Sequence, residues 1–285
     1  MSNDLMIMPD FLSPEVVQAE LDAQAELVNP ASLFPRMRLN KDVRGFMLNM
    51  GEQNLGTPAE VQFLILGAEN LYGSRALFRP EQGGEDTSPV CSTSLGSPAR
   101  QDQWVGRWND DSGFDKPHAN LTCGSCPWGQ WSSAGKWDDS KSGKGPACGQ
   151  RRTIYGIRVE ESERRGMFKV VDDTIIQLVL PATSIKATQA MVAKATAAKI
   201  PLSAACFMLS AKMQSRGSIK WCTLEAELVG VIGDKASYAR VQELRQKVTN
   251  VVGRSSAVET TPYSETSATL ADTQTASVVD DVIPF

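Results

Sequence analysis

Outside one long central segment, the apolar positions of this chain fall in short runs typical of β-strands. These runs are rich in β-branched and aromatic residues and are bounded by Gly, Pro or polar turns. We expect strands over Arg36–Asn40, Gly45–Asn49, Val61–Ala68, Thr153–Val159, Asp173–Leu180, Ala204–Lys212 and Trp221–Ile232. The pattern therefore predicts a mainly β protein.

Three stretches show the longer apolar repeat and the end signals of helices. One runs over residues 184–199 and is closed by Pro201, and another runs over 235–251 and is closed by Gly253. A third, acidic helix is expected over 14–21. Short strands with a helix in the middle of the series suggest a small antiparallel barrel. The oligonucleotide-binding (OB) barrel is the version whose open face and loops suit single strands.

Four of the six cysteines predict a metal site in the central segment. Cys123 and Cys126 form a CxxC turn, with Cys91 upstream and Cys148 downstream. Four thiolates suit a closed, structural zinc ion, Zn(2+). His118, the only histidine, is an alternative to Cys91 as a ligand. Because the segment is rich in Gly, Ser, Asp and Pro, we expect it to need such a clamp, as a zinc-ribbon-like insert over about residues 88–150.

The same segment holds five of the six tryptophans, and two interpretations of them stay open. They are Trp104, Trp108, Trp128, Trp131 and Trp137. The rings either form a small core around the zinc or stack on nucleic-acid bases. Trp128, Trp131 and Trp137 are the favoured stacking residues because they share a stretch with basic residues. The neighbouring candidates for phosphate contacts are Lys136, Lys141, Lys144, Arg151 and Arg152.

Charge is distributed unevenly along the chain. Residues 253–285 hold one base and five acids, which accounts for the whole formal charge of -4. Residues 1–90 hold 6 bases and 13 acids, whereas residues 183–252 hold 10 bases and 4 acids. A polyanion would therefore meet the later part of the folded body first. The candidate phosphate contacts there are Lys186, Lys194, Lys212, Arg216 and Lys220.

The last 33 residues, 253–285, predict a disordered acidic tail with a binding tip. The stretch is rich in Ser, Thr and Ala and cannot bury enough apolar surface to offset its ordering entropy. Its end combines two carboxylates with an apolar hook and a terminal Phe. The candidate partner-binding residues are Asp280, Asp281, Ile283, Pro284 and Phe285.

Two resemblances extend this interpretation. The tip resembles that of bacterial single-stranded DNA-binding proteins, whose tails end in Asp-Asp-Ile-Pro-Phe and recruit replication and repair enzymes; here Val282 is interposed. Over roughly residues 85–230, the CxxCP pattern, the Gly/Lys-rich run to Cys148 and the Leu180–Ser184 helix start are similar to bacteriophage single-stranded DNA-binding proteins with a zinc insert. This likeness implies zinc at the four cysteines and DNA binding by the body.

The sequence thus predicts a body over residues 1–252 and a tail over 253–285. We expect a non-enzymatic protein that coats single-stranded DNA without strong sequence preference in phage DNA replication, recombination and repair, and recruits partner enzymes of phage or host through its tip. The alternative is a zinc-ribbon transcription or adaptor protein acting mainly through protein contacts. No targeting or membrane segment is evident, so we expect a cytoplasmic protein of the infected bacterial host, possibly a homo-oligomer.

Overall fold

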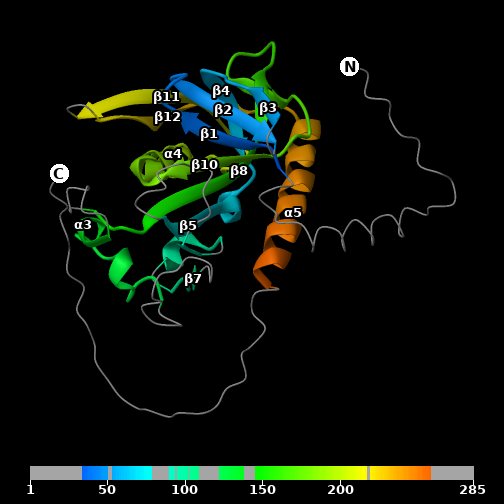
Figure 1. Ribbon diagram of the computed structural model, residues 1–285. Coiled ribbons are helices and arrows are strands. Elements are labelled where there is room, and N and C mark those ends of the chain that lie inside the picture. Colours follow the sequence, from blue (N-terminus) through cyan, green and yellow to red (C-terminus); the bar gives the residue numbers. More distant parts are fainter. Residues whose placement is uncertain are drawn as a thin grey trace.

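The computed structural model describes residues 34–50, 53–78, 90–93, 95–101, 103–108, 122–137, 145–216 and 219–257. These parts form a mainly β structure (Figure 1). The strands are β1 (Arg36–Asn40), β2 (Gly45–Met50), β3 (Gln53–Gly56), β4 (Glu60–Ile65), β5 (Leu71–Leu77), β6 (Cys91–Ser92), β7 (Arg107–Trp108), β8 (Gly149–Glu161), β9 (Met167–Val170), β10 (Ile176–Pro181), β11 (Ala205–Arg216) and β12 (Ile219–Ile232). The α-helices are α3 (Ala134–Trp137), α4 (Ile185–Ala197) and α5 (Lys235–Ala257).

Five strands are hydrogen-bonded into a closed ring. Strands β11, β4, β8 and β9 are adjacent in that order, and each pair is antiparallel. Numbered along the chain within the ring, this spatial order is 4-1-2-3, which is that of a Greek key. Strand β12 completes the ring by pairing with β11 on one side and with β9 on the other.

Further strands extend the sheet from the first part of β8. Strand β10 pairs with β8 and, in parallel, with β1, which continues antiparallel into β2 and then β3. The β9–β12 pair is also parallel, so the sheet is mixed, and the expectation of a purely antiparallel barrel is corrected. Parallel neighbours need a crossover connection, and here the chain between β9 and β12 passes through β10, α4 and β11.

The sheet separates two apolar cores. Successive side chains of a strand point to opposite faces: Phe63 and Ile65 of β4 enter one core, while Leu64 and Leu66, the residue directly after the strand, enter the other. Helix α4 closes the first core with Met191. Helix α5 closes the second with its buried side chains, Val241, Leu244, Val248 and Val252. Among the helices that the structure describes, none has both the length and the apolar character to cross a membrane.

The predicted strands and two of the predicted helices are present, with shifted ends. Helix α5 continues to Ala257, past the expected stop at Gly253, so the first residues assigned to the tail belong to the helix. The expected helix over 14–21 lies outside the described residues. Strands β3, β5, β6, β7 and β9 were not predicted, because they are short or carry few apolar residues and gain their order by pairing with longer strands.

Helix α5 should contribute substantially to stability through its buried face. We expect Leu244→Ala to lower the free energy of unfolding by about 2–5 kcal/mol, because Leu244 is 3% exposed and its loss leaves a cavity. Lys247→Ala on the exposed face is the matched control and should have little effect. Urea denaturation of both variants measures the difference; equal stabilities would contradict the assignment of this face to the core.

Candidate nucleic-acid interface

The segment with the tryptophans and cysteines is the connection between β4 and β8. Strand β5 pairs with the first half of β8, β6 pairs with β5, and β7 pairs with β6. This chain of pairings carries the segment away from the ring, to the lower part of Figure 1, where α3 also lies. We call residues 66–148 the insert. It is larger than the expected 88–150 because β5 belongs to it.

One tryptophan of the insert is strongly exposed. The Trp131 side chain is 76% exposed and sits in a turn followed by Ser132, which has a φ of 66°. Buried Ser133 fixes this turn: its hydroxyl lies 2.7 Å from the Gln130 carbonyl oxygen and accepts a hydrogen bond from the backbone N–H of Ala147 at 2.8 Å. The ring is thus presented by an ordered turn and has the geometry of a stacking platform.

Other rings of the insert belong to its core instead. Trp104 is 9% exposed, and Trp108 and Trp128 pack against a small cluster of Leu77, Cys91 and Cys148. The preference for Trp128 as a stacking residue is therefore not supported by its packing. Trp137 ends α3, and its side chain lies outside the described residues.

The four cysteines of the insert approach one another but do not form a ligand set. The pKa values of Cys91 and Cys148 are raised to about 12, mainly by burial and in smaller part by the neighbouring thiols. Burial also raises the pKa of Cys123, which favours the neutral thiol over the thiolate that a metal requires.

The prediction of a structural zinc ion is corrected by this geometry. Within the described ranges, no three side chains of His, Cys, Asp or Glu are placed so that they could hold a metal ion. Cys91 and Cys148 instead lie in the apolar cluster with Leu77, where they pack as small hydrophobic residues. His118, the alternative ligand, lies outside the described residues.

The basic candidates near the insert have different environments. Lys136 is exposed, and the Arg151 guanidinium lies 5.0 Å from the centre of the Phe78 ring. Arg152 is only 8% exposed and does not reach the surface as a phosphate contact would. Lys141 and Lys144 lie outside the described residues.

A second basic group lies on α4 and on the hairpin of β11 and β12. Lys186 and Lys194 are exposed on α4, and the Lys194 ammonium donates a hydrogen bond to the Ala226 carbonyl at 2.7 Å. On the hairpin, Lys212 forms a 2.5 Å ion pair with Glu225, and Lys220 is exposed. The side chain of Arg216, at the hairpin tip, lies outside the described residues.

The hairpin also carries a tryptophan that the sequence argument did not select. Trp221 lies directly opposite Gln214, two positions from the Lys212–Thr223 pair, so these side chains share one face of the ribbon. The opposite face, with the pair Ala211 and Leu224, leads into the core. The strand pattern around Trp221 gave no reason to separate it from core residues; the pairing register does. Trp221 is partly exposed and next to positive charge.

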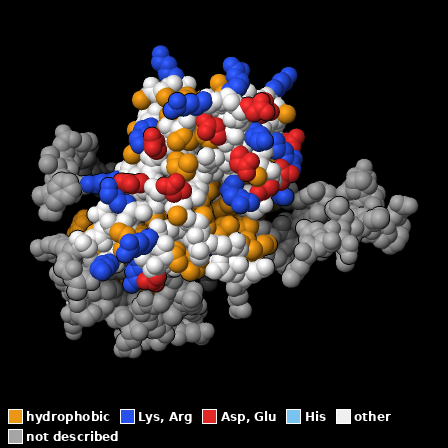
Figure 2. All heavy atoms as spheres, turned by 90° about the horizontal axis from the view of Figure 1, so that it is seen from above, with side chains coloured by type: hydrophobic (Ala, Val, Ile, Leu, Met, Phe, Trp, Pro, Cys, Tyr) orange, Lys and Arg blue, Asp and Glu red, His pale blue; other side chains and the backbone are white. Residues whose placement is uncertain are grey.

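Charge is mixed on the face of the molecule drawn in Figure 2. Figure 2 shows Lys and Arg side chains interspersed with Asp and Glu on the visible face. A cavity of about 690 Å³ between β4 and β8 illustrates this: it is lined by Glu60, Glu160 and Arg158, and Arg158 is paired with Asp172 at 2.6 Å. This cavity offers no excess positive charge among its lining residues, so the insert and the hairpin are better placed to meet phosphates.

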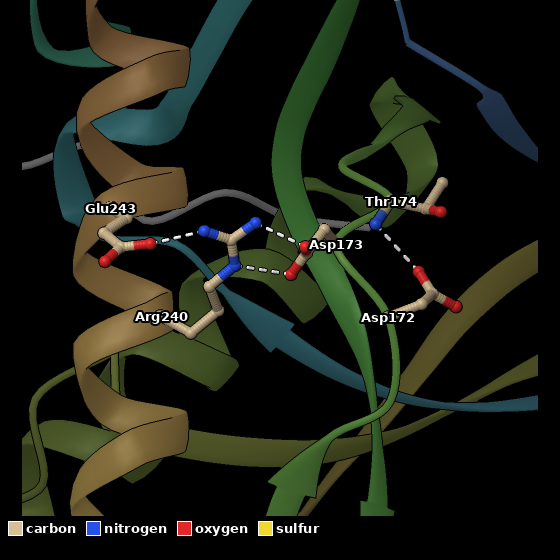
Figure 3. Close-up of polar contacts among 5 residues, drawn as sticks. All are labelled: Asp172, Asp173, Thr174, Arg240 and Glu243. Carbon is tan, nitrogen blue, oxygen red and sulfur yellow. Dashed lines mark hydrogen bonds and ion pairs between the residues drawn. The ribbon is translucent and has the colours of Figure 1, made fainter. Parts of the chain in front are cut away.

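The acidic pair Asp172 and Asp173 has a structural role (Figure 3). Asp173 accepts a hydrogen bond from Arg240 Nε at 2.6 Å, and Arg240 also pairs with Glu243 on α5. Asp172 accepts a hydrogen bond from the backbone N–H of Thr174 at 2.8 Å. The Asp173–Arg240 contacts attach α5 to the loop before β10. Asp172 instead accepts hydrogen bonds within that loop, from Thr174, and from Arg158 of β8, so the two carboxylates serve different contacts.

No protein-family model, curated protein or solved structure matches this chain.

The Asp173–Arg240 pair should make the attachment of α5 sensitive to acid. The hydrogen bond from Arg240 holds the pKa of Asp173 below its ordinary value of about 4. The stability that the Asp173–Arg240 pair contributes is therefore fully present above the ordinary pKa, and it is lost as the pH falls through the lower pKa of the folded state. We expect Arg240→Gln to reduce the loss in thermal midpoint between pH 7 and pH 3. Lys136→Gln, which removes one exposed charge on the insert, should leave that loss unchanged; equal losses in wild type and both variants would refute the linkage.

Proposed function

We propose that this chain is a single-stranded DNA-binding protein, of the phage type that its sequence resembles, and that its body is an OB-type barrel. The observation that carries the proposal is the position of two aromatic and basic segments on the five-strand ring. In an OB barrel, the loop between the first and second strands and the loop between the fourth and fifth bind nucleic acid. In this ring those two connections are the insert and the turn of the β11–β12 hairpin.

Each of these two connections carries a tryptophan side chain and basic side chains. The insert presents Trp131 with Lys136 five residues later, and the hairpin presents Trp221 on one face with Lys212, while Lys220 lies on the opposite face next to the hairpin tip. Figure 1 places the hairpin and α3 toward the same side of the molecule, with α4 between them. Stacking of bases on such rings tolerates any sequence, because every base has a flat face. The lysines supply the phosphate contacts that make binding depend on salt.

Recruitment of partner enzymes by the tip is the second part of the proposal. It rests on the sequence of Asp280, Asp281, Ile283, Pro284 and Phe285, which lie outside the described residues. Phe285 suits an apolar slot in a partner, and the carboxylates suit a basic rim around that slot. The alternative of a zinc-ribbon adaptor depended on a metal site, and the described residues of the insert do not form one.

Binding to single strands is the first test. We expect tight binding of fluorescent oligo-dT in a polarisation titration, weaker binding of duplex DNA, and a steep fall in affinity when salt is raised from 50 to about 200 mM. Comparable affinity for duplex and single strand would favour a different class of nucleic-acid protein. Absence of binding to either would overturn the proposal.

The two exposed rings should carry part of that affinity. We expect Trp131→Ala and Trp221→Ala each to weaken oligo-dT binding by about 1–3 kcal/mol. The thermal midpoint of Trp131→Ala should stay close to that of wild type because the ring is 76% exposed. Val105→Ala is the matched control, since Val105 is 52% exposed in the insert but has no aromatic face. Normal affinity in both tryptophan variants would refute the stacking role.

Deleting Val278–Phe285 should separate the two activities. The truncated chain should lose binding to replication and repair enzymes, whereas its affinity for oligo-dT should stay equal or rise modestly at low salt, because fewer carboxylates compete with phosphates. Phe285→Ala should reproduce the loss of partners with little effect on DNA. Loss of DNA binding with retained partners would show that the tail belongs to the nucleic-acid site.

A further inference from the structure

Arg152 is a buried cation without a partner among the residues that the structure describes. It lies near the start of β8, is 8% exposed, and its Nη1 atom is shielded from solvent without a hydrogen bond. No carboxylate or carbonyl in the described part of the chain pairs with this guanidinium, and burial alone lowers its pKa. A buried arginine is ordinarily paired, because an uncompensated charge in the interior costs several kcal/mol. The described part of the chain thus leaves the charge of this arginine uncompensated.

Arg152 lines a cavity of about 540 Å³ between β5, α4 and the loop over Ser97–Ala99. This volume is in the range of small-ligand sites. Its walls are mainly apolar with one aromatic ring, and their polar groups include Arg152, the Glu69 carboxylate, Thr188 and Gln189. The lining includes Leu71, Tyr72, Pro98, Arg152, Val192 and Leu202. Such a combination fits a flat, largely apolar ligand that has hydrogen-bond acceptors on one edge.

Gly73 and Trp104 hold the arginine in place. A Cβ atom on Gly73 would lie 2.5 Å from Arg152 Nη1 and 2.4 Å from the Trp104 ring. Only glycine leaves room for both at this position of β5. Trp104, which is 9% exposed, therefore packs where it limits the movement of the guanidinium. A positioned arginine loses little entropy when it forms a forked pair of hydrogen bonds.

We propose that this cavity receives one guanine base of the bound strand, with Arg152 donating to the base edge. Guanine has two neighbouring acceptors, O6 and N7, and arginine binds them with two parallel hydrogen bonds. The apolar walls and the Tyr72 ring suit the faces of a base better than a hydrated phosphate. Burial raises the pKa of Tyr72, so its hydroxyl stays neutral beside the ligand. This inference rests on the proposed function and adds a single guanine-preferring site to otherwise unselective binding.

The test compares oligo-dT with the same oligomer carrying one central guanine, using the full chain. Wild type should bind the guanine-containing strand about tenfold more tightly, in line with one forked contact. Arg152→Met should abolish this preference and retain oligo-dT binding. Its thermal midpoint should be equal or higher, since the variant removes an uncompensated buried charge. Arg152→Lys keeps the charge but lacks the fork, and should also lose the preference.

Arg151→Met is the matched control, because the adjacent side chain lies over Phe78 and does not line the cavity. It should retain the preference, even if both affinities fall. Equal binding of the two oligomers by wild type, with oligo-dT bound normally, would overturn the guanine site and leave the proposed function intact. If oligo-dT does not bind, the proposed function fails, and titration with dGMP then tests the guanine site by itself. Binding of dGMP that Arg152→Met abolishes would support the site. Absence of dGMP binding would overturn it.

Discussion

Strand β8 is the constraint on which the rest of the structure depends, because it pairs with β10, β5, β4 and β9 along its length. Its change of partner occurs near Gly156, which faces both Ile176 and Ile65. A Cβ atom there would lie 2.3 Å from the Phe63 ring and 2.4 Å from the Leu64 carbonyl oxygen. Any side chain would separate β4 from β8, and the ring would open at the point where both cores meet.

The candidate interface follows from this arrangement. Because β4 and β8 are neighbours, the insert must leave and re-enter the ring on adjacent strands, and β5 anchors it by pairing with β8. The hairpin is positioned by the β4–β11 pairing on the other side of β4. In the proposed function, the tryptophan and the basic side chains of each connection contact one strand of nucleic acid. Arg152 belongs to the same strand β8, and the cavity beside it is formed by β5, α4 and the loop over Ser97–Ala99.

The elements themselves were largely predictable, and the failures have identifiable causes. The strand Arg36–Asn40 was placed correctly, since its pattern and its turn are local. The four-cysteine zinc site was wrong, because spacing along the chain does not report whether the sulfurs point at one ion or into an apolar cluster around Leu77. The difference between Trp128, which packs on that cluster, and Trp221, which is partly exposed, has a related cause: composition selects tryptophan, but packing and register decide which side chain faces solvent.

The sequence by itself determined the mainly β class, most strands, helices α4 and α5, and the acidic end, because periodicity, end signals and composition act over short stretches of chain. Only the tertiary structure decided the closed ring, the exposure of Trp131, the pairing of Asp173 with Arg240, and the burial of Arg152. These depend on contacts between residues far apart in sequence. In the sequence, Arg152 follows Arg151 in a strand and has the pattern of a surface cation. Its burial follows only from the pairing of the neighbouring strand β5, which places Gly73 opposite Arg152.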